Sequence, residues 1–202
     1  ELIESDAPLP IHRALAIVSY ITDSLGEAHH QGLVHRDLKP PNVIIQQRFG
    51  QSDFARVLDF GIARVLRDPE AKIGHHLSTI DVAGTPAYMS PEQILGQDPD
   101  PRSDLYALGV ILYEMLTRAR PFGEENAVEL CMKQLNETPP TIASKRGDDD
   151  VSEALEAVVG SLLLKDVDER PSSAAAVRAS RTSPDWRGTC SISRSPLAGP
   201  AP

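Results

Sequence analysis

The sequence predicts a mainly helical α+β fold with one small β-hairpin and a long irregular loop. Three observations support this fold class: apolar residues recur at helical spacing in several segments, two short apolar or β-branched runs lie close together, and residues 62–92 show no steady period. The chain has 202 residues, of which 41% are hydrophobic and 24% charged, and this composition fits one soluble globular domain with a real core.

The first predicted helix covers residues 10–31. Pro10 suits the start of a helix, and Gly32 suits the position just past its end. Apolar residues between them are spaced by three and four positions, which predicts a buried stripe along one side of the helix. The stripe consists of Ile11, Leu15, Val18, Ile21, Leu25 and Ala28.

Two short strands are predicted at residues 43–47 and 56–60, because these runs are rich in apolar and β-branched side chains. The polar letters RFGQSD between them predict a hairpin with a longish loop. The next stretch, residues 62–92, contains Gly, Pro, Ser and Thr and has no period. A structureless stretch of this length inside a compact domain is usually functional or mobile.

A second long helix is predicted over residues 105–117, with Ser103 and Asp104 offering its N-cap. The segment is apolar nearly all round, which predicts a central, buried position. Residues 181–202 are rich in Ser, Pro and Gly and have little to bury, so we expect a disordered tail. Weaker helical patterns lie at residues 126–135, 151–164 and 172–179.

Charge and cysteine content argue against several classes of protein. The net charge of −9 is unsuited to a general nucleic-acid or anionic-membrane binder. Cys131 and Cys190 form no disulfide framework and no CxxC pair, which favours a reducing, cytoplasmic setting. The apolar run at residues 105–116 is too short to span a membrane, and residues 1–10 lack the basic start of a signal peptide. The full-length protein could still be membrane-anchored outside this segment.

Three short motifs carry the chemistry: HRDLKPPN at residues 35–42, DFG at 59–61 and SPE at 90–92. Their order and separation match the signature of protein kinases. On these motifs the chain resembles the eukaryotic-like (Hanks-type) serine/threonine protein kinases, and the letters LDFGIARVL and GTPAYMSPEQ resemble the bacterial members. The resemblance covers residues 1–180 and implies the C-terminal lobe of the kinase fold.

The resemblance implies an ATP-dependent phosphotransferase that acts on Ser or Thr of protein substrates, with Mg²⁺ as the metal and Mn²⁺ as an alternative. Asp37 would accept or orient the hydroxyl proton, and Lys39 would place a positive charge beside the transferring phosphate. Asn42 and Asp59 would supply oxygens to the metal, and Ile44 would lie under the adenine of ATP. Taken singly, the two aspartates would be read as surface carboxylates or helix caps.

Five further residues match structural positions of the family. His35 and Phe60 would belong to an internal packing column, and Asp104 would anchor that column and the backbone of the catalytic loop. A simpler role for Asp104 is to complement the helix dipole, and the two roles are compatible. Glu92 and Arg170 would form an ion pair, and the alternative is two unrelated surface charges.

Four residues are expected to serve substrate binding and regulation. Thr85, in the letters GTPAY, matches the residue that meets the catalytic Asp and Lys and shapes the substrate-peptide site. Arg36 matches an arginine that receives a phosphate placed on the activation loop. Thr79 is the preferred acceptor of that phosphate and Ser78 the second choice. The alternative is that Ser78 and Thr79 are ordinary polar loop residues.

The sequence departs from the kinase pattern at its start. It contains no GxGxxG loop, and Lys39 is the only lysine before Asp59, so the N-terminal lobe and half of the ATP site are expected to be absent. These residues alone are therefore expected to have little kinase activity. The alternative function is a catalytically inactive kinase-like module that binds a protein partner, or a truncated remnant.

The adjacent histidines at positions 29–30 and 75–76 are not expected to bind a metal. Neighbours on a helix do not face one another, and neither pair has a Cys or carboxylate at ligand spacing. The acidic letters GDDDVSE at 147–153 lack the oxygen spacing of a calcium loop and are expected to be a solvated loop before a helix.

Overall fold

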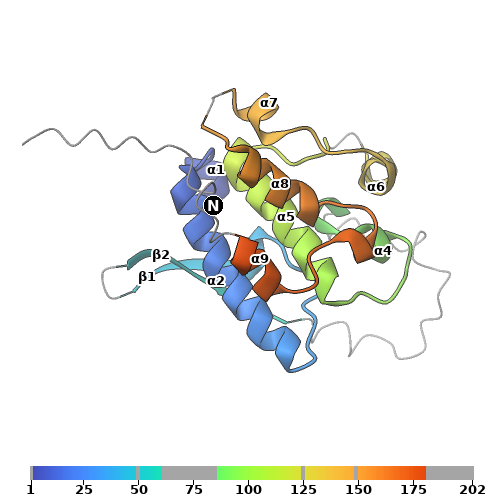
Figure 1. Cartoon of the computed structure of the whole chain (residues 1–202), viewed down its shortest axis with the longest axis horizontal. Helices are drawn as coiled ribbons and strands as arrows, with labels where there is room; N and C mark the ends of the chain where they lie inside the picture. The colour runs from blue at the N-terminus through green and yellow to red at the C-terminus, as the bar shows by residue number, and fades with distance from the viewer. Residues whose placement is uncertain (1, 49–50, 61–85, 124–125, 148–149, 181–202) are drawn as a thin grey trace, which may run out of the picture.

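The computed structural model describes residues 2–48, 51–60, 86–123, 126–147 and 150–180. In this part of the chain, helices pack around one central helix, and a two-stranded sheet lies against the long helix near the N-terminus (Figure 1). The predicted mainly helical α+β class is confirmed. The helices are α1 (Leu2–Asp6), α2 (Ile11–His30), α4 (Pro91–Ile94), α5 (Pro101–Thr117), α6 (Ala127–Asn136), α7 (Ile142–Arg146), α8 (Glu153–Leu162) and α9 (Ala174–Ser180), with short 3₁₀ turns η1 (Pro40–Asn42), η2 (Pro86–Tyr88) and η3 (Val167–Glu169).

Helix α2 follows the predicted bounds closely. It begins after Pro10, and Gly32 just beyond its end has a left-handed φ of 74°, a conformation that glycine adopts without strain. The predicted stripe is buried from Leu15 to Ala28, and it packs on α5 and α9. Burial of this stripe fixes the end of α2 beside the start of the HRDLKPPN segment.

Helix α5 is the centre of the core, as its all-round apolar sequence predicts (Figure 1). It begins earlier than predicted: Asp100, and not Ser103 or Asp104, is the N-cap, and its side chain accepts a hydrogen bond from the backbone N–H of Arg102. Pro101 takes the first helical position, where its missing N–H costs nothing. The early start places Ser103 and Asp104 inside the first turn, with both side chains buried.

The β-hairpin is longer than predicted. Strands β1 (Val43–Arg48) and β2 (Gln51–Val57) pair antiparallel, with Val43 opposite Val57 and Arg48 opposite Gln51. The predicted hairpin is present, but the bounds of its second strand were wrong: the strand covers 51–57 and not 56–60, and residues 51–53, expected in a longish loop, belong to it. Backbone pairing between strands does not need apolar side chains, so the polar letters QSD extend the ladder where the sequence suggested a loop.

Three short helices, α1, α4 and α7, were missed because they are too short to show a period. Helix α4 begins with a capping box, in which Ser90 and Gln93 each bond the other's backbone. Helix α7 begins at the N-cap Thr141 and ends at Gly147, which has a left-handed φ of 72°. The three weaker helical predictions correspond to α6, α8 and α9, with bounds displaced by one or two residues. Within the described ranges, no helix is long and apolar enough to cross a membrane.

Candidate active site

The backbone of the HRDLKPPN segment is fastened to helix α5 by Asp104, which is 1% exposed. One oxygen of its carboxylate accepts a hydrogen bond from the backbone N–H of His35 at 2.8 Å, and the other accepts from Arg36 N–H at 2.9 Å. A buried carboxylate is tolerated only when it is hydrogen-bonded in this way. Arg36 has a left-handed φ of 66°, so the chain turns sharply just before Asp37.

His29 is a third partner of Asp104 that the sequence analysis missed. Its Nε2 lies 2.8 Å from Oδ2 of Asp104, and the two residues are 75 positions apart in sequence. In the sequence, the pair of adjacent histidines suggests only a metal ligand. A usable signal was its position four residues after Leu25, which places it on the buried side of α2.

His35 joins the loop to the end of strand β2. Its Nε2 lies 2.8 Å from the backbone oxygen of Leu58, and its Nδ1 lies 3.3 Å from the backbone nitrogen of Asp37. Because a carbonyl oxygen only accepts, Nε2 carries the proton, and Nδ1 can then accept from Asp37 N–H. The ring also packs on Phe60, with centroids 5.1 Å apart and planes tilted by 60°.

Asp59 lies between two residues that are both held. The N–H of Leu58 donates to the backbone oxygen of Asn42 at 2.8 Å, and Phe60 rests on His35. Asp59 itself is exposed and has a left-handed φ of 52°. The residue before Asp59 is thus bonded to Asn42, although Asp59 and Asn42 are 17 positions apart in the sequence.

Asp37, Lys39 and Asn42 converge at the surface. Lys39 Nζ lies 2.9 Å from Oδ2 and 3.2 Å from Oδ1 of Asp37. The side-chain amide nitrogen of Asn42 donates to the backbone oxygen of Asp37 at 2.7 Å. The Asp37 carboxylate is 60% exposed, so another molecule can reach it. An exposed ion pair contributes little to stability, so stability does not explain this arrangement.

Glu92 and Arg170 form a buried, bidentate ion pair, with both nitrogen–oxygen distances at 2.7 Å. The hydroxyl of Ser103 donates to the same carboxylate at 2.6 Å. Burial alone would raise the pKa of Glu92, but the hydrogen bonds from Arg170 and Ser103 lower it to about 2. Arg170 also donates to the backbone oxygens of Leu164 and Lys165, so the pair joins α4, α5 and the segment after α8.

Comparison with known proteins assigns the family. The sequence model of the protein kinase domain matches residues 1–180. The chain belongs to the protein kinase family.

Three bacterial kinases illustrate the relationship. Serine/threonine-protein kinase pkn3 of Myxococcus xanthus is 42% identical over 180 residues, which cover 89% of this chain and 32% of that protein. Pkn1 of the same organism is 42% identical over 174 residues, covering 85% and 24%. PknB of Mycolicibacterium smegmatis is 37% identical over 179 residues, covering 89% and 27%. This kinase chain therefore spans about a third or less of the length of these relatives.

Solved kinase structures share the fold. The PknI kinase domain of Mycobacterium tuberculosis matches with a TM-score of 0.60 and 28% identity, covering 88% of this chain and 58% of that one. A variant of the same domain matches with a TM-score of 0.61 and 26% identity, covering 88% and 56%. These matches assign the described helices and hairpin to the kinase fold.

Several predicted residues of this kinase chain lie outside the described residues: Ser78, Thr79, Thr85 and the tail at 181–202. Ile44 is described, lies on β1 and is 39% exposed. The backbone oxygen of Arg36 accepts a hydrogen bond from the Gln93 side chain at 2.7 Å. Helix α4 is thereby joined to the loop directly before Asp37.

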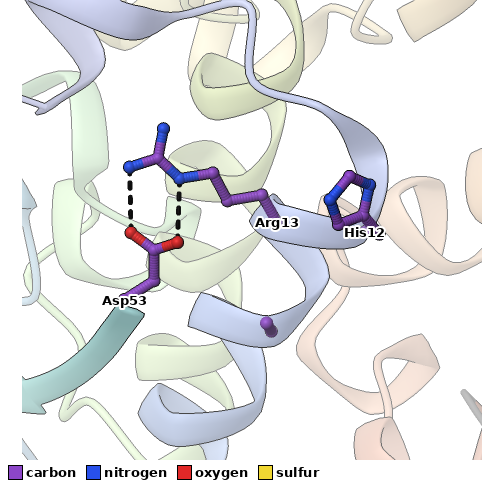
Figure 2. A pocket seen from close by; sticks show the side chains of 4 residues that line it. His12, Arg13 and Asp53 are labelled. Atoms are coloured by element: carbon purple, nitrogen blue, oxygen red, sulfur yellow. Dashed lines mark hydrogen bonds and ion pairs between the residues drawn. The ribbon is translucent and has the colours of Figure 1, made fainter. Parts of the chain in front are cut away.

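A hollow of about 410 Å³ lies elsewhere, between α2 and β2 (Figure 2). It is lined by His12, Arg13, Ala16 and Asp53, and none of these is a candidate site residue of the kinase. Arg13 holds Asp53 through two hydrogen bonds of 2.9 Å, and hydrogen bonds to Asp53 and Asp6 raise the pKa of Arg13. The charged groups at this hollow satisfy one another, and they fasten the hairpin to α2.

Proposed function

We propose that this chain provides the catalytic lobe of a serine/threonine protein kinase, which transfers the γ-phosphate of ATP to Ser or Thr hydroxyls of protein substrates. The observation that carries the proposal is the convergence of Asp37, Lys39 and Asn42, with Leu58, the residue before Asp59, hydrogen-bonded to Asn42. Phosphoryl transfer asks a protein mainly for positioning and electrostatic stabilisation, and the loop supplies both.

Each residue has a role that follows from its chemistry. Asp37 is exposed, and its carboxylate accepts or orients the proton of the substrate hydroxyl. Lys39 lies within 3 Å of that carboxylate and can move to the phosphate, where its charge offsets the charge that is transferred. Asp104 and His35 position the loop and do not touch the reacting atoms.

Asn42 and Asp59 fit a divalent cation. One amide oxygen and one carboxylate are hard oxygen ligands, and Mg²⁺ is usually held by one or two carboxylates together with substrate phosphates and water. Mn²⁺ suits the same oxygens. When bound, the cation supplies positive charge to the phosphate oxygens. Ile44 offers apolar surface on β1, which suits the face of an adenine ring.

Regulation and substrate binding complete the proposal. Arg36, whose backbone is left-handed just before Asp37, is the proposed receiver of a phosphate on Thr79, with Ser78 as the second acceptor. Thr85 is the proposed contact to the substrate peptide. The residue that follows it in the sequence opens η2, which lies next to α4 and so near the loop.

A second candidate function is favoured by one observation. The sequence has no GxGxxG motif, and no lysine other than Lys39 precedes Asp59. A chain acting by itself would lack the groups that hold the α- and β-phosphates of ATP. Such a chain would be a kinase-like module that binds a protein partner without transferring phosphate.

One experiment separates the two functions. The chain is assayed alone and after joining to the N-terminal lobe of the related kinase pkn3, and the joined protein is called the reconstituted kinase. We expect the chain alone to bind MgATP weakly or not at all, and the reconstituted kinase to phosphorylate a Ser/Thr peptide. Calorimetry measures nucleotide binding, and phosphate incorporation measures transfer. Micromolar nucleotide binding with turnover by the chain alone would show that the missing groups are dispensable.

Two matched substitutions test the roles in the reconstituted kinase. Asp37→Asn should lower turnover about 10²–10⁴-fold and leave nucleotide binding intact, because this carboxylate meets the hydroxyl. Asp59→Asn should weaken MgATP binding itself. Asp23→Asn on the exposed side of α2 is the control and should change neither quantity. Full turnover in Asp37→Asn would contradict the assignment.

A further inference from the structure

Gln134 is a fully buried polar side chain that joins three elements. It lies on α6 and is 0% exposed. Its amide nitrogen donates to the backbone oxygen of Ala87 at 2.6 Å and to that of Pro86 at 3.3 Å, both in η2. Its amide oxygen accepts a hydrogen bond from the hydroxyl of Tyr106 on α5. Among the described residues, the hydrogen bonds of this side-chain amide therefore all go to η2 or to the central helix α5.

Helix α4, which follows η2 in the sequence, is hydrogen-bonded to the catalytic loop. Ser90 and Gln93 form the capping box of α4, and Gln93 donates to the backbone oxygen of Arg36 at 2.7 Å. The segment 86–94 therefore lies between two anchors, one on α6 and one at the residue before Asp37. A change at Gln134 would therefore reach the residue before Asp37 through the segment 86–94.

The α6 anchor is itself held in place. Lys165 Nζ donates to the backbone oxygen of Gln134 at 2.7 Å and lies 4.5 Å from the centre of the Phe122 ring. Phe122 packs with Ala87 and Leu130 in a small apolar cluster of its own. A three-residue 3₁₀ turn has few hydrogen bonds of its own, so its position depends on contacts of this kind.

We propose that Gln134 is a positioning residue for the polypeptide substrate. Its amide holds the carbonyls of Pro86 and Ala87, and so sets where the chain next to Thr85 lies relative to Asp37. This inference rests on the proposed kinase function. Nucleotide binding is assigned to different residues, Asn42 and Asp59, and within the described part of the chain neither is hydrogen-bonded to Gln134 or η2. Loss of the Gln134 amide should therefore weaken peptide binding and leave ATP binding unchanged.

The test uses Gln134→Met in the reconstituted kinase, because methionine keeps the length of the side chain and removes its donor and acceptor. One lost hydrogen bond should raise the KM for a Ser/Thr peptide about 3- to 10-fold. The KM for ATP and kcat should stay within about twofold. Asn136→Ala is the matched control, because that exposed amide bonds only to its own helix, at Met132, among the described residues.

Two further variants keep the test decisive if Gln134→Met folds poorly. Tyr106→Phe removes the partner of the amide oxygen and keeps the two bonds to η2, so it should change the peptide KM less than Gln134→Met. Gln134→Glu keeps an acceptor for Tyr106 and turns a carboxylate toward the two carbonyls, so it should raise the peptide KM at least as much. In this chain alone, Gln134→Met should also speed amide exchange at Met89, whose N–H donates to Pro86.

The possible failures differ from one another. If the wild-type reconstituted kinase is active and Gln134→Met has an unchanged peptide KM, the role of Gln134 is rejected and the proposed kinase function still stands. A fall in kcat with a parallel rise in both KM values would show general damage and also reject the positioning role. A wild-type reconstituted kinase that transfers no phosphate would reject the proposed function, and with it this inference.

Discussion

Replacement of Arg170 by methionine should destabilise the chain strongly. Arg170 and Glu92 are both buried, and Arg170→Met leaves the Glu92 carboxylate with Ser103 as its remaining side-chain donor in the described part of the chain. The fall in the pKa of Glu92 from 4.5 to about 2 corresponds to about 3 kcal/mol of folding free energy. Removal of one partner from a buried ion pair typically costs about 3–5 kcal/mol, so the two magnitudes agree.

The same variant should change how stability depends on pH. In the wild type the pKa of Glu92 is lower in the folded state, so this contribution is complete above about pH 4.5 and is lost as the pH falls toward 2. Without Arg170, burial raises the pKa of Glu92 instead. The folded variant then binds the proton more readily than the unfolded chain, and its stability should rise relative to the wild type as the pH falls.

Urea denaturation followed by circular dichroism, at pH 7 and at several values between 5 and 3, measures both effects. Arg178→Met is the matched control, because Arg178 pairs with Asp23 at the surface, with side chains 61% and 46% exposed. That control should cost less than about 1 kcal/mol and keep the wild-type pH dependence. The reasoning fails if Arg170→Met costs no more than Arg178→Met, or if its pH dependence matches that of the wild type.

Three other outcomes are expected. Gly109→Ala should lower the free energy of unfolding by about 1–3 kcal/mol in thermal denaturation, because the added Cβ would lie 2.8 Å from Cβ of Leu162. Gly160→Ala is the control and should be neutral or stabilising, because its added Cβ meets no atom within 4 Å. Asn126→Ala removes the N-cap of α6 and should cost about 1 kcal/mol by urea denaturation. Thr79→Ala should lower turnover of the reconstituted kinase if Arg36 binds a phosphate there, and mass spectrometry that finds no phosphate on residues 64–85 of the fully active protein would reject this switch.

The long helices could be predicted because a buried helix face requires apolar residues at regular helical spacing. The stripe from Ile11 to Ala28 and the apolar run of α5 each specify one packing solution. The exact starts of helices and strands, and the turns between them, are less clearly marked in the sequence. Asp100 caps α5 through one hydrogen bond to Arg102, and Ser103 had equally suitable chemistry in the sequence. The start of β2 at Gln51 depends on pairing with β1, which no local pattern encodes.

The candidate site could be predicted where a motif keeps its members close in sequence, or where the family resemblance itself pairs distant residues, as it does for Glu92 with Arg170. Asp37, Lys39 and Asn42 fall within one turn of chain, so their letters already suggest their contacts. The contact of His29 with Asp104 and that of Gln134 with Ala87 join distant segments. Nothing in the local letters distinguishes such residues from ordinary polar positions on a helix. Their roles come from the packing of α2, α5 and α6.

The dependence of the loop on Asp104 has a consequence during synthesis of the protein. The backbone of His35 is held by a carboxylate that is made 69 residues later. At about 5–20 residues per second, roughly 3–14 s pass on the ribosome between the two. During that interval His35 and Arg36 have already been synthesised, but the Asp104 carboxylate that holds their backbone has not. The nascent chain therefore contains the HRDLKPPN residues for several seconds before their catalytic geometry can form.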